Sequence, residues 1–261
     1  MKKKKIIKDL KSLEKNIEFK IVNKKKSEIS ISNLDIQFKI EFPLKIFSYF
    51  KNKEIKVEVV NCNFKEAIFK DCEFNYKFKN SDFNDVSFEN VTFEGKMRFH
   101  ECNFQEETKF NNIVFKDLVD FWNSTFNKKV IFYKVDFEKT SVFSIVTFRE
   151  NVLFTYSRFV GQGIFRRTTI KKGIDFSLAI IEKDLLIYDF ELSDFDTEDQ
   201  NLKKEEYESL ITHEGVIPQK NKRETFRLIK KYLKNQEDFV EANKAFYLEL
   251  NTYKSELKKI Y

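Results

Sequence analysis

The sequence has little of what chains usually use to turn, with 5 glycines and 2 prolines among 261 residues. Most turns must therefore be made by other residue types. Only 2 histidines are present, so a histidine-based site is poorly supplied. Three cysteines and a basic start without an apolar leader do not suggest a secreted disulfide scaffold. No stretch approaches the roughly 18–20 apolar residues of a membrane helix, so we expect a cytoplasmic protein, with peripheral membrane contact left open.

The motifs of common active sites are missing as well. We find no glycine-rich phosphate loop, no GxSxG and no HExxH. Cys62 and Cys72 are ten residues apart, which is not a zinc spacing. The stretch RFHECNF at 98–104 groups a histidine, a glutamate and a cysteine, but the repeat described below separates them. We expect no enzyme, no catalytic residue, no cofactor and no metal.

Basic charge is concentrated near the N-terminus, while the rest of the chain is nearly neutral. Residues 1–59 hold 16 lysines and 8 acidic residues, a net +8, whereas residues 60–190 hold 19 basic and 19 acidic residues. Such a segment favours an anionic partner, nucleic acid or a membrane surface, although a solvated lysine face explains it as well. The candidate anion-binding residues are Lys2, Lys3, Lys4, Lys5, Lys24, Lys25 and Lys26.

What the chain does contain is phenylalanine, 31 in all, and these residues recur at regular steps. The early steps are mostly five, and from Phe93 onward steps of six and five alternate through Ile187. Neither a helix nor a single strand produces this spacing. The 24 markers lie at 64, 69, 74, 78, 83, 88, 93, 99, 104, 110, 115, 121, 126, 132, 137, 143, 148, 154, 159, 165, 170, 176, 181 and 187.

Two positions before each marker the residue is mostly small or β-branched. Residues two apart share one face of an extended segment, so both should point inward, with polar residues outside and a bend after each unit. His100 and Glu101 would then face solvent while Cys102 faces the core, where a free cysteine behaves as a small hydrophobe. The inward small positions include Cys62, Cys72, Cys102, Ser124, Ser141, Ser157 and Gly163.

Units such as NCNFK, EAIFK, DCEFN, NSDFN, DVSFE and NVTFE resemble those of the pentapeptide-repeat family over about residues 60–190. The resemblance implies a mainly β fold, a right-handed quadrilateral β-solenoid with four units per coil and about six coils. Markers four units apart should stack, with Phe99, Phe121, Phe143 and Phe165 in one ladder that ends on Ile187. The six-residue steps should add a wider turn or bulge, and Tyr76 occupies a small position where we expect a local irregularity. The expected core residues are Phe99, Phe104, Phe110, Phe115, Phe121, Phe126, Phe132, Phe137, Phe143, Phe148, Phe154, Phe159 and Phe165.

A solenoid has two open ends that need covers. We expect residues 1–59 to form an N-terminal cap with a short helix at about 4–15 and strands at 18–42. Residues 60–190 form the solenoid, 191–221 a polar linker, and 222–261 a helical hairpin with apolar stripes at Phe226, Ile229 and Leu233 and at Phe239, Ala242, Phe246, Leu250, Tyr253 and Leu257.

The expected function is a non-catalytic scaffold for protein–protein interaction, with an unidentified protein partner and a possible homodimer through the C-terminal helices. Binding of nucleic acid or an anionic membrane by the N-terminal lysines is the alternative. Some pentapeptide-repeat proteins mimic DNA and bind gyrase, but that role needs a strongly negative tube, and the repeat region here is neutral.

Overall fold

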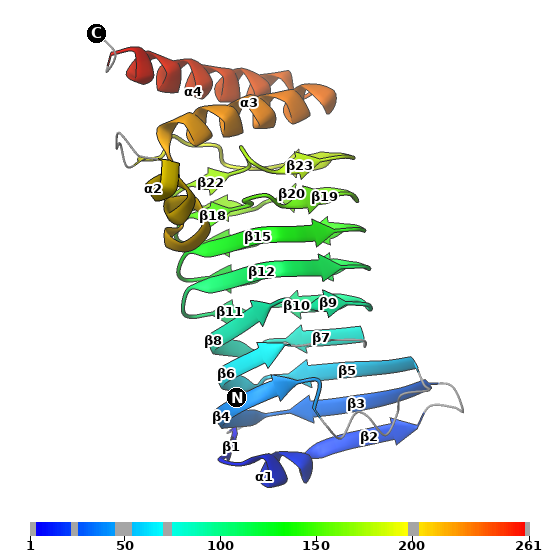
Figure 1. Cartoon of the computed structure of the whole chain (residues 1–261). Coiled ribbons are helices and arrows are strands. Elements are labelled where there is room, and N and C mark those ends of the chain that lie inside the picture. The colour runs from blue at the N-terminus through cyan, green and yellow to red at the C-terminus, as the bar shows by residue number, and fades with distance from the viewer. Residues whose placement is uncertain (1–3, 22–25, 45–53, 70–74, 198–203, 259–261) are drawn as a thin grey trace.

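The computed structural model describes residues 4–21, 26–44, 54–69, 75–197 and 204–258 (Figure 1). Its strands wind into a β-solenoid of about six coils, followed by a pair of helices. The strands form one sheet of 9 and one of 15, and strands of successive coils pair in parallel. The mainly β solenoid predicted from the repeat is confirmed.

Each coil has four walls, which we number along the chain. The first wall consists of β3 (Lys26–Ser32), β5 (Glu54–Val60), β7 (Asn75–Lys79), β10 (Met97–His100), β13 (Val119–Asp120), β16 (Ser141–Val142), β20 (Gly163–Arg166) and β24 (Leu185–Tyr188). The second and third walls share β4 (Leu34–Phe42), β6 (Asn63–Phe69) and β8 (Asp82–Glu89). The second wall continues with β11 (Asn103–Phe104), β14 (Thr125–Phe126), β17 (Thr147–Phe148) and β21 (Thr169–Ile170).

The third wall continues with the first halves of β12 (Thr108–Phe115) and β15 (Val130–Phe137), then β18 (Val152–Leu153) and β22 (Ile174–Asp175). The fourth wall consists of β9 (Thr92–Phe93), the second halves of β12 and β15, β19 (Arg158–Phe159) and β23 (Ile180–Ile181). In the regular coils each strand therefore pairs with its counterpart in the next coil, and the paired residues are 22 apart in the sequence, as Phe110 and Phe132 are.

The interior is filled by ladders of phenylalanine rings, one ladder for each wall. On the first wall the rings of Phe99, Phe121, Phe143 and Phe165 stack with centroids 5.3, 5.3 and 4.8 Å apart, and Phe165 pairs with Ile187. Rings of different walls meet edge to face, as Phe110 does with Phe121 at 5.8 Å. Both arrangements suit the ring quadrupole, so the core gains specific aromatic contacts as well as buried area.

The corners explain why so little glycine is needed. Left-handed backbone falls on non-glycine residues, most often asparagine, which tolerates this conformation better than other residues. Between the first and second walls these corner residues are Asn33, Asn61, Asn80, Glu101, Asn123, Ile145, Arg167 and Asp189. Asn90, Asn112, Lys134 and Tyr156 lie between the third and fourth walls. Those between Phe64 and Ile187 all fall within five-residue steps, and the six-residue steps of the described coils turn without positive φ at a non-glycine residue.

The N-terminal segment takes part in the coil pattern. β3 pairs in parallel with β5, and β4 pairs in parallel with β6 across the boundary expected at residue 60. The helix expected at 4–15 is shorter: β1 (Lys5–Ile7) pairs with β4, and α1 covers only Leu10–Glu14. β2 (Ile17–Ile21) is antiparallel to β3 and ends this sheet. Tyr76 is buried in register with Val57 and Met97, so the large ring is held inside the tube.

The C-terminal end of the tube is covered by α3 (Gln219–Asn235), and α4 (Phe239–Leu257) packs on α3 as a second layer (Figure 1). Ile229, Tyr232 and Leu233 of α3 join the core of the solenoid. The Gln236 side chain donates to the carbonyl of Leu185 and accepts from the amide of Ile187, at 3.1 and 2.9 Å. The helix thus supplies hydrogen bonds that a further coil would have made.

Residues 204–217, within the segment expected to be a polar linker, dock on the third wall. They comprise α2 (Lys204–Ser209), the π-helix η2 (Leu210–Glu214) and a turn at Gly215 with left-handed φ of 62°. Ile211 and Ile217 pack with Leu153, and Thr155 donates to the carbonyl of Ile211 at 3.0 Å.

Candidate functional site

The described cysteines are built into the core. Cys62 and Cys102 are buried, and each thiol contacts the carbonyl two residues earlier at 3.5 Å. Burial raises the pKa of Cys62 to about 11 and also raises the pKa of Cys102. Both thiols are therefore protonated and poor nucleophiles at neutral pH. Cys72 lies outside the described residues.

The other small inward positions also hold the coils together. The hydroxyl of Ser124 donates to the carbonyl of Phe99 at 2.8 Å and accepts from the amide of Cys102 at 2.9 Å. Ser157 donates in the same way to the carbonyl of Phe132 at 2.8 Å. Ser141 is buried, and its hydroxyl has no hydrogen-bond partner within the described part of the chain. Gly163 is small because an added Cβ would lie 2.7 Å from Cδ2 of Leu185.

The histidines do not converge with the cysteines. His100 lies on the outside of the first wall, where Nε2 is 2.8 Å from Oδ2 of Asp120 and the ring meets Trp122 edge to face. Its neighbour Glu101 forms the left-handed corner. His213 is exposed at the end of η2, beside the hydroxyl of Thr212 at 2.6 Å. Among the described residues no group of three or more His, Cys, Asp or Glu is arranged to hold a metal.

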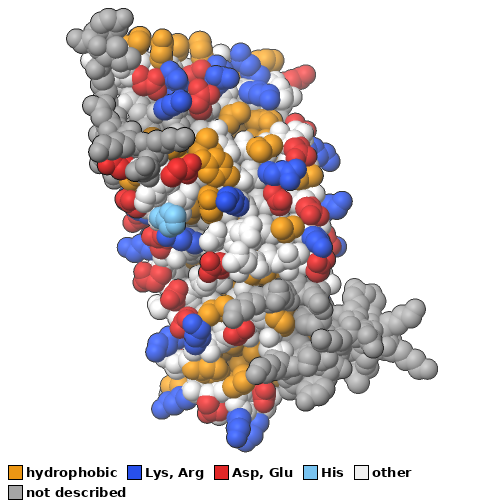
Figure 2. Space-filling model, viewed as in Figure 1, with side chains coloured by type: hydrophobic (Ala, Val, Ile, Leu, Met, Phe, Trp, Pro, Cys, Tyr) orange, Lys and Arg blue, Asp and Glu red, His pale blue; other side chains and the backbone are white. Residues whose placement is uncertain are grey.

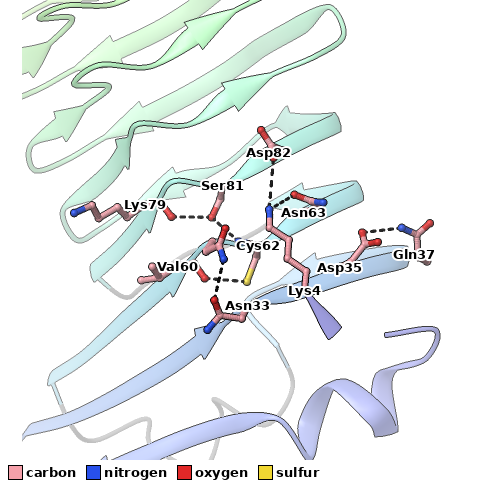
Figure 3. A network of polar contacts seen from close by, with 11 residues as sticks. Lys4, Asn33, Asp35, Gln37, Val60, Cys62, Asn63, Lys79, Ser81 and Asp82 are labelled. Carbon is pink, nitrogen blue, oxygen red and sulfur yellow. Dashed lines mark hydrogen bonds and ion pairs between the residues drawn. The ribbon is translucent and has the colours of Figure 1, made fainter. Parts of the chain in front are cut away.

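Only part of the proposed anion-binding set lies within the described structure. The Lys4 ammonium donates to the amide oxygen of Asn63 and lies 3.6 Å from a carboxylate oxygen of Asp82 (Figure 3). The side chain is therefore engaged in holding the residue directly before β1 against the second wall. Lys5 donates to Asn16 at 2.8 Å. Lys2, Lys3, Lys24 and Lys25 are outside the described residues, as is the side chain of Lys26.

An apolar row on the outside of the first wall was not expected. Val142, Ile164 and Leu186 occupy outward positions of β16, β20 and β24 and lie in register in successive coils. They are half-buried, and exposed Trp122 and Tyr188 lie in the neighbouring outward column. Sequence reasoning missed this row because a full coil separates its members along the chain. We call these five residues the first-wall row.

The third wall has the same kind of outward apolar residues, but there they are covered. Ile131 of β15 and Leu153 of β18 occupy outward positions, pair with each other and are fully buried. Leu153 packs with Ile211 and Ile217, and the turn at Gly215 lies beside Ile131. Lys129 and Asn151 donate to the carbonyls of Glu214 and Gly215. This wall shows how a short helical segment binds to an apolar row of the tube.

A second apolar surface lies on α4. The stripe predicted from helical spacing faces solvent at five of its six positions: Phe239, Phe246, Leu250, Tyr253 and Leu257 are exposed, and only Ala242 is buried. α4 instead packs through Ala242, Ala245, Leu248 and Thr252. Together with exposed Val240 and Tyr247, the five residues form what we call the α4 face.

The remaining surface is rich in charged side chains, with exposed apolar residues such as Ile6, Phe19 and Ile180 among them. On the face drawn in Figure 2, basic and acidic side chains are mixed along the tube. Several ion pairs join successive coils, such as Lys116 with Glu94 at 2.7 Å and Arg158 with Glu182 at 2.7 Å. None of the helices in the described ranges is long and apolar enough to cross a membrane.

Comparison with protein-family models, with curated proteins and with solved structures gave no match to this chain. The fold is that of a phenylalanine-rich repeat β-solenoid with a C-terminal helical pair.

Proposed function

We propose that this protein is a non-catalytic scaffold of the pentapeptide-repeat type that binds a protein partner along its first wall. The 24 markers in register and their small partners support the family assignment. The observation that carries the function is the first-wall row, a set of apolar side chains that follow one another from coil to coil on the outside of the tube. Exposed apolar strips rimmed by polar residues are typical of protein-binding surfaces.

The partner segment we infer is a short helix with two or three aliphatic anchors. The chain's own residues 204–217 supply the precedent, since they use Ile211 and Ile217 to cover the third wall. Carbonyls of that segment accept hydrogen bonds from Lys129 and Asn151 at the edge of the row. On the first wall exposed Arg166 lies between Trp122 and Tyr188 in the outward column and is available to a partner in the same way.

A photo-crosslinking amino acid at Ser144 would test this. Ser144 lies in the same outward column as Trp122, and replacing it leaves every member of the row intact. We expect one crosslinked protein in the native cell, with the crosslink mapped to an amphipathic helical segment. The same probe at Thr147, on the second wall, should capture little of it.

The identified segment is then measured as a synthetic peptide against the full chain. Ile164→Ser should weaken its binding at least tenfold, since a buried aliphatic anchor contributes about 1.5–3 kcal/mol. Val91→Ala, on the inside of another wall, should leave the affinity unchanged. Equal crosslinking at Ser144 and Thr147, or a peptide affinity insensitive to Ile164→Ser, contradicts the proposal.

A further inference from the structure

We propose that the C-terminal end of the tube docks peripherally on an anionic lipid surface, through the α4 face and the lysines beside it. This inference is independent of the first-wall row. The α4 face lies at the tip of the molecule, where Figure 2 shows a line of apolar side chains with basic and acidic side chains next to it. Phe239, Val240 and Tyr247 are 61%, 70% and 65% exposed, which is far more than a folded helix needs to leave open.

The apolar side chains of the α4 face are not the ones through which α4 packs against α3. α4 buries a separate, small-residue side against α3, with Ala242 and Ala245 fully covered. The α4 face instead combines phenylalanine, tyrosine, leucine and valine. Aromatic rings with a polar edge suit the boundary between headgroups and acyl chains, and an amphipathic helix lying in that plane buries one apolar side.

In the helical pair, the acidic side chains of α4 are engaged with basic partners, whereas several lysines are left without an ion pair to a described residue. The acidic residues of α4 are turned inward or paired: Glu249 with Lys230 and Glu256 with Arg223, both within 2.6 Å, and Glu241 with Lys244 at 2.5 Å. Exposed Lys231, Lys234, Lys254 and Lys258 have no ion pair with any described residue. Of the exposed carboxylates, Glu237 in the turn between the helices is the one closest in sequence to Lys231 and Lys234.

Lysines and apolar face form one continuous surface. Lys230 of α3 places its ammonium 4.6 Å from the ring centre of Phe246, and Arg223 lies over Tyr253 at 5.3 Å. On the outer side of α3, Arg227, Lys231 and Lys234 line an open groove together with Leu228. The surface therefore presents exposed rings at its centre and cations along its flank.

Charge decides between a lipid surface and a second copy of this chain. Two copies meeting through the α4 face would bring the unpaired lysines of both molecules together. An anionic bilayer instead neutralises them, and each lysine near such a surface adds to the binding. The tip of a rigid tube also reaches a flat surface without a change of shape.

The experiment is co-sedimentation of the full chain with vesicles of phosphatidylcholine, alone or containing roughly 30% phosphatidylserine, a composition that gives a negative surface. We expect binding to the anionic vesicles and little to the neutral ones. Lys231→Ala, Lys234→Ala, Lys254→Ala and Lys258→Ala combined should lower the bound fraction at least tenfold. Tyr247→Ser with Leu250→Ser should lower it similarly while all lysines remain.

The matched control removes four exposed lysines from the walls, Lys65, Lys96, Lys128 and Lys139, with the same change in net charge. This variant should bind like the parent protein, and circular dichroism checks that each variant stays folded. Equal loss in both lysine variants, or loss only on replacing the N-terminal lysines, overturns the proposal. A dimer by light scattering that Tyr247→Ser with Leu250→Ser converts to monomer, without vesicle binding by the parent, assigns the α4 face to a second copy instead.

Discussion

The coils before Met97 and those after it solve the same packing problem with different regularity. Along the first wall Val57, Tyr76 and Met97 pair in succession but are unevenly spaced in the sequence. From Met97 onward the partners Val119, Ser141, Gly163 and Leu185 follow at equal steps. In the early coils all left-handed corners are asparagine, at 33, 61, 80 and 90. In the later coils only Asn112 and Asn123 remain among eight such corners within 101–189.

This difference shows what a constant coil length contributes. The amide of each left-handed corner residue between the first and second walls, from Asn33 to Arg167, donates to a carbonyl of the next coil. The early corners Asn33, Asn61 and Asn80 make this hydrogen bond too, so the difference lies in the equal length of the later coils, where residues that disfavour the conformation are tolerated. The early coils lack that constancy and use the residue best suited to the turn. Asn61 and Asn33 also bond to each other at 2.8 Å.

The largest expected difference lies in the ring ladders. Phe126 is stacked between Phe104 and Phe148, at 4.4 and 5.2 Å, whereas Phe64 is stacked on Phe83 at 5.0 Å and meets Phe42 edge-on. We expect Phe126→Ala to lower the free energy of unfolding by about 4 kcal/mol and Phe64→Ala by about 3 kcal/mol. Urea denaturation measures both, and a larger loss for Phe64→Ala would break the comparison.

The next effect concerns two glycines of the later coils. A Cβ on Gly161 would lie 2.3 Å from backbone atoms of Lys139, so Gly161→Ala must push two coils apart and should cost about 3 kcal/mol. A Cβ on Gly173 would meet only side chains, Ile217 and Phe195, which can move, so Gly173→Ala should cost about 1 kcal/mol. Thermal unfolding of the two variants gives the order, and equal losses would show that the coils separate easily.

Serines in equivalent small positions provide a finer test. Ser124 makes two buried hydrogen bonds, so Ser124→Ala should destabilise by about 1.5 kcal/mol. Ser141→Ala removes a buried hydroxyl without a described partner and should leave stability unchanged or raise it by about 0.3 kcal/mol. Chemical denaturation distinguishes them, and a clear loss for Ser141→Ala would reveal a hydrogen bond at that position.

The smallest effect is expected at the corners themselves. Ile145 is β-branched at φ of 58°, so Ile145→Asn should stabilise the protein by about 0.7 kcal/mol. The reverse change at an early corner, Asn80→Ile at φ of 48°, should cost more than Ile145→Asn gains. The shift in melting temperature measures both, and opposite signs are required for the comparison to hold.

The interior was readable from the sequence because each marker among the described residues fills an inward position of a strand-like step, and that rule needs no distant contact. Surfaces were harder to predict. The α4 stripe has the spacing of a buried face, yet the hairpin packs through Ala242 and Ala245, whose small side chains let the helices approach closely. Ile211 and Ile217 have neither helical nor strand spacing, so their docking on Leu153 is visible only in three dimensions.

The constant coil length also determines above which wall of the tube the helical pair lies. Adding one regular coil would move the helical pair about 4.8 Å along the axis and leave it above the same wall. Adding half a coil would turn it through half a circuit, so that α3 and α4 would overhang the opposite side from before. The length and number of the coils therefore fix both the distance and the angle between the first-wall row and the α4 face.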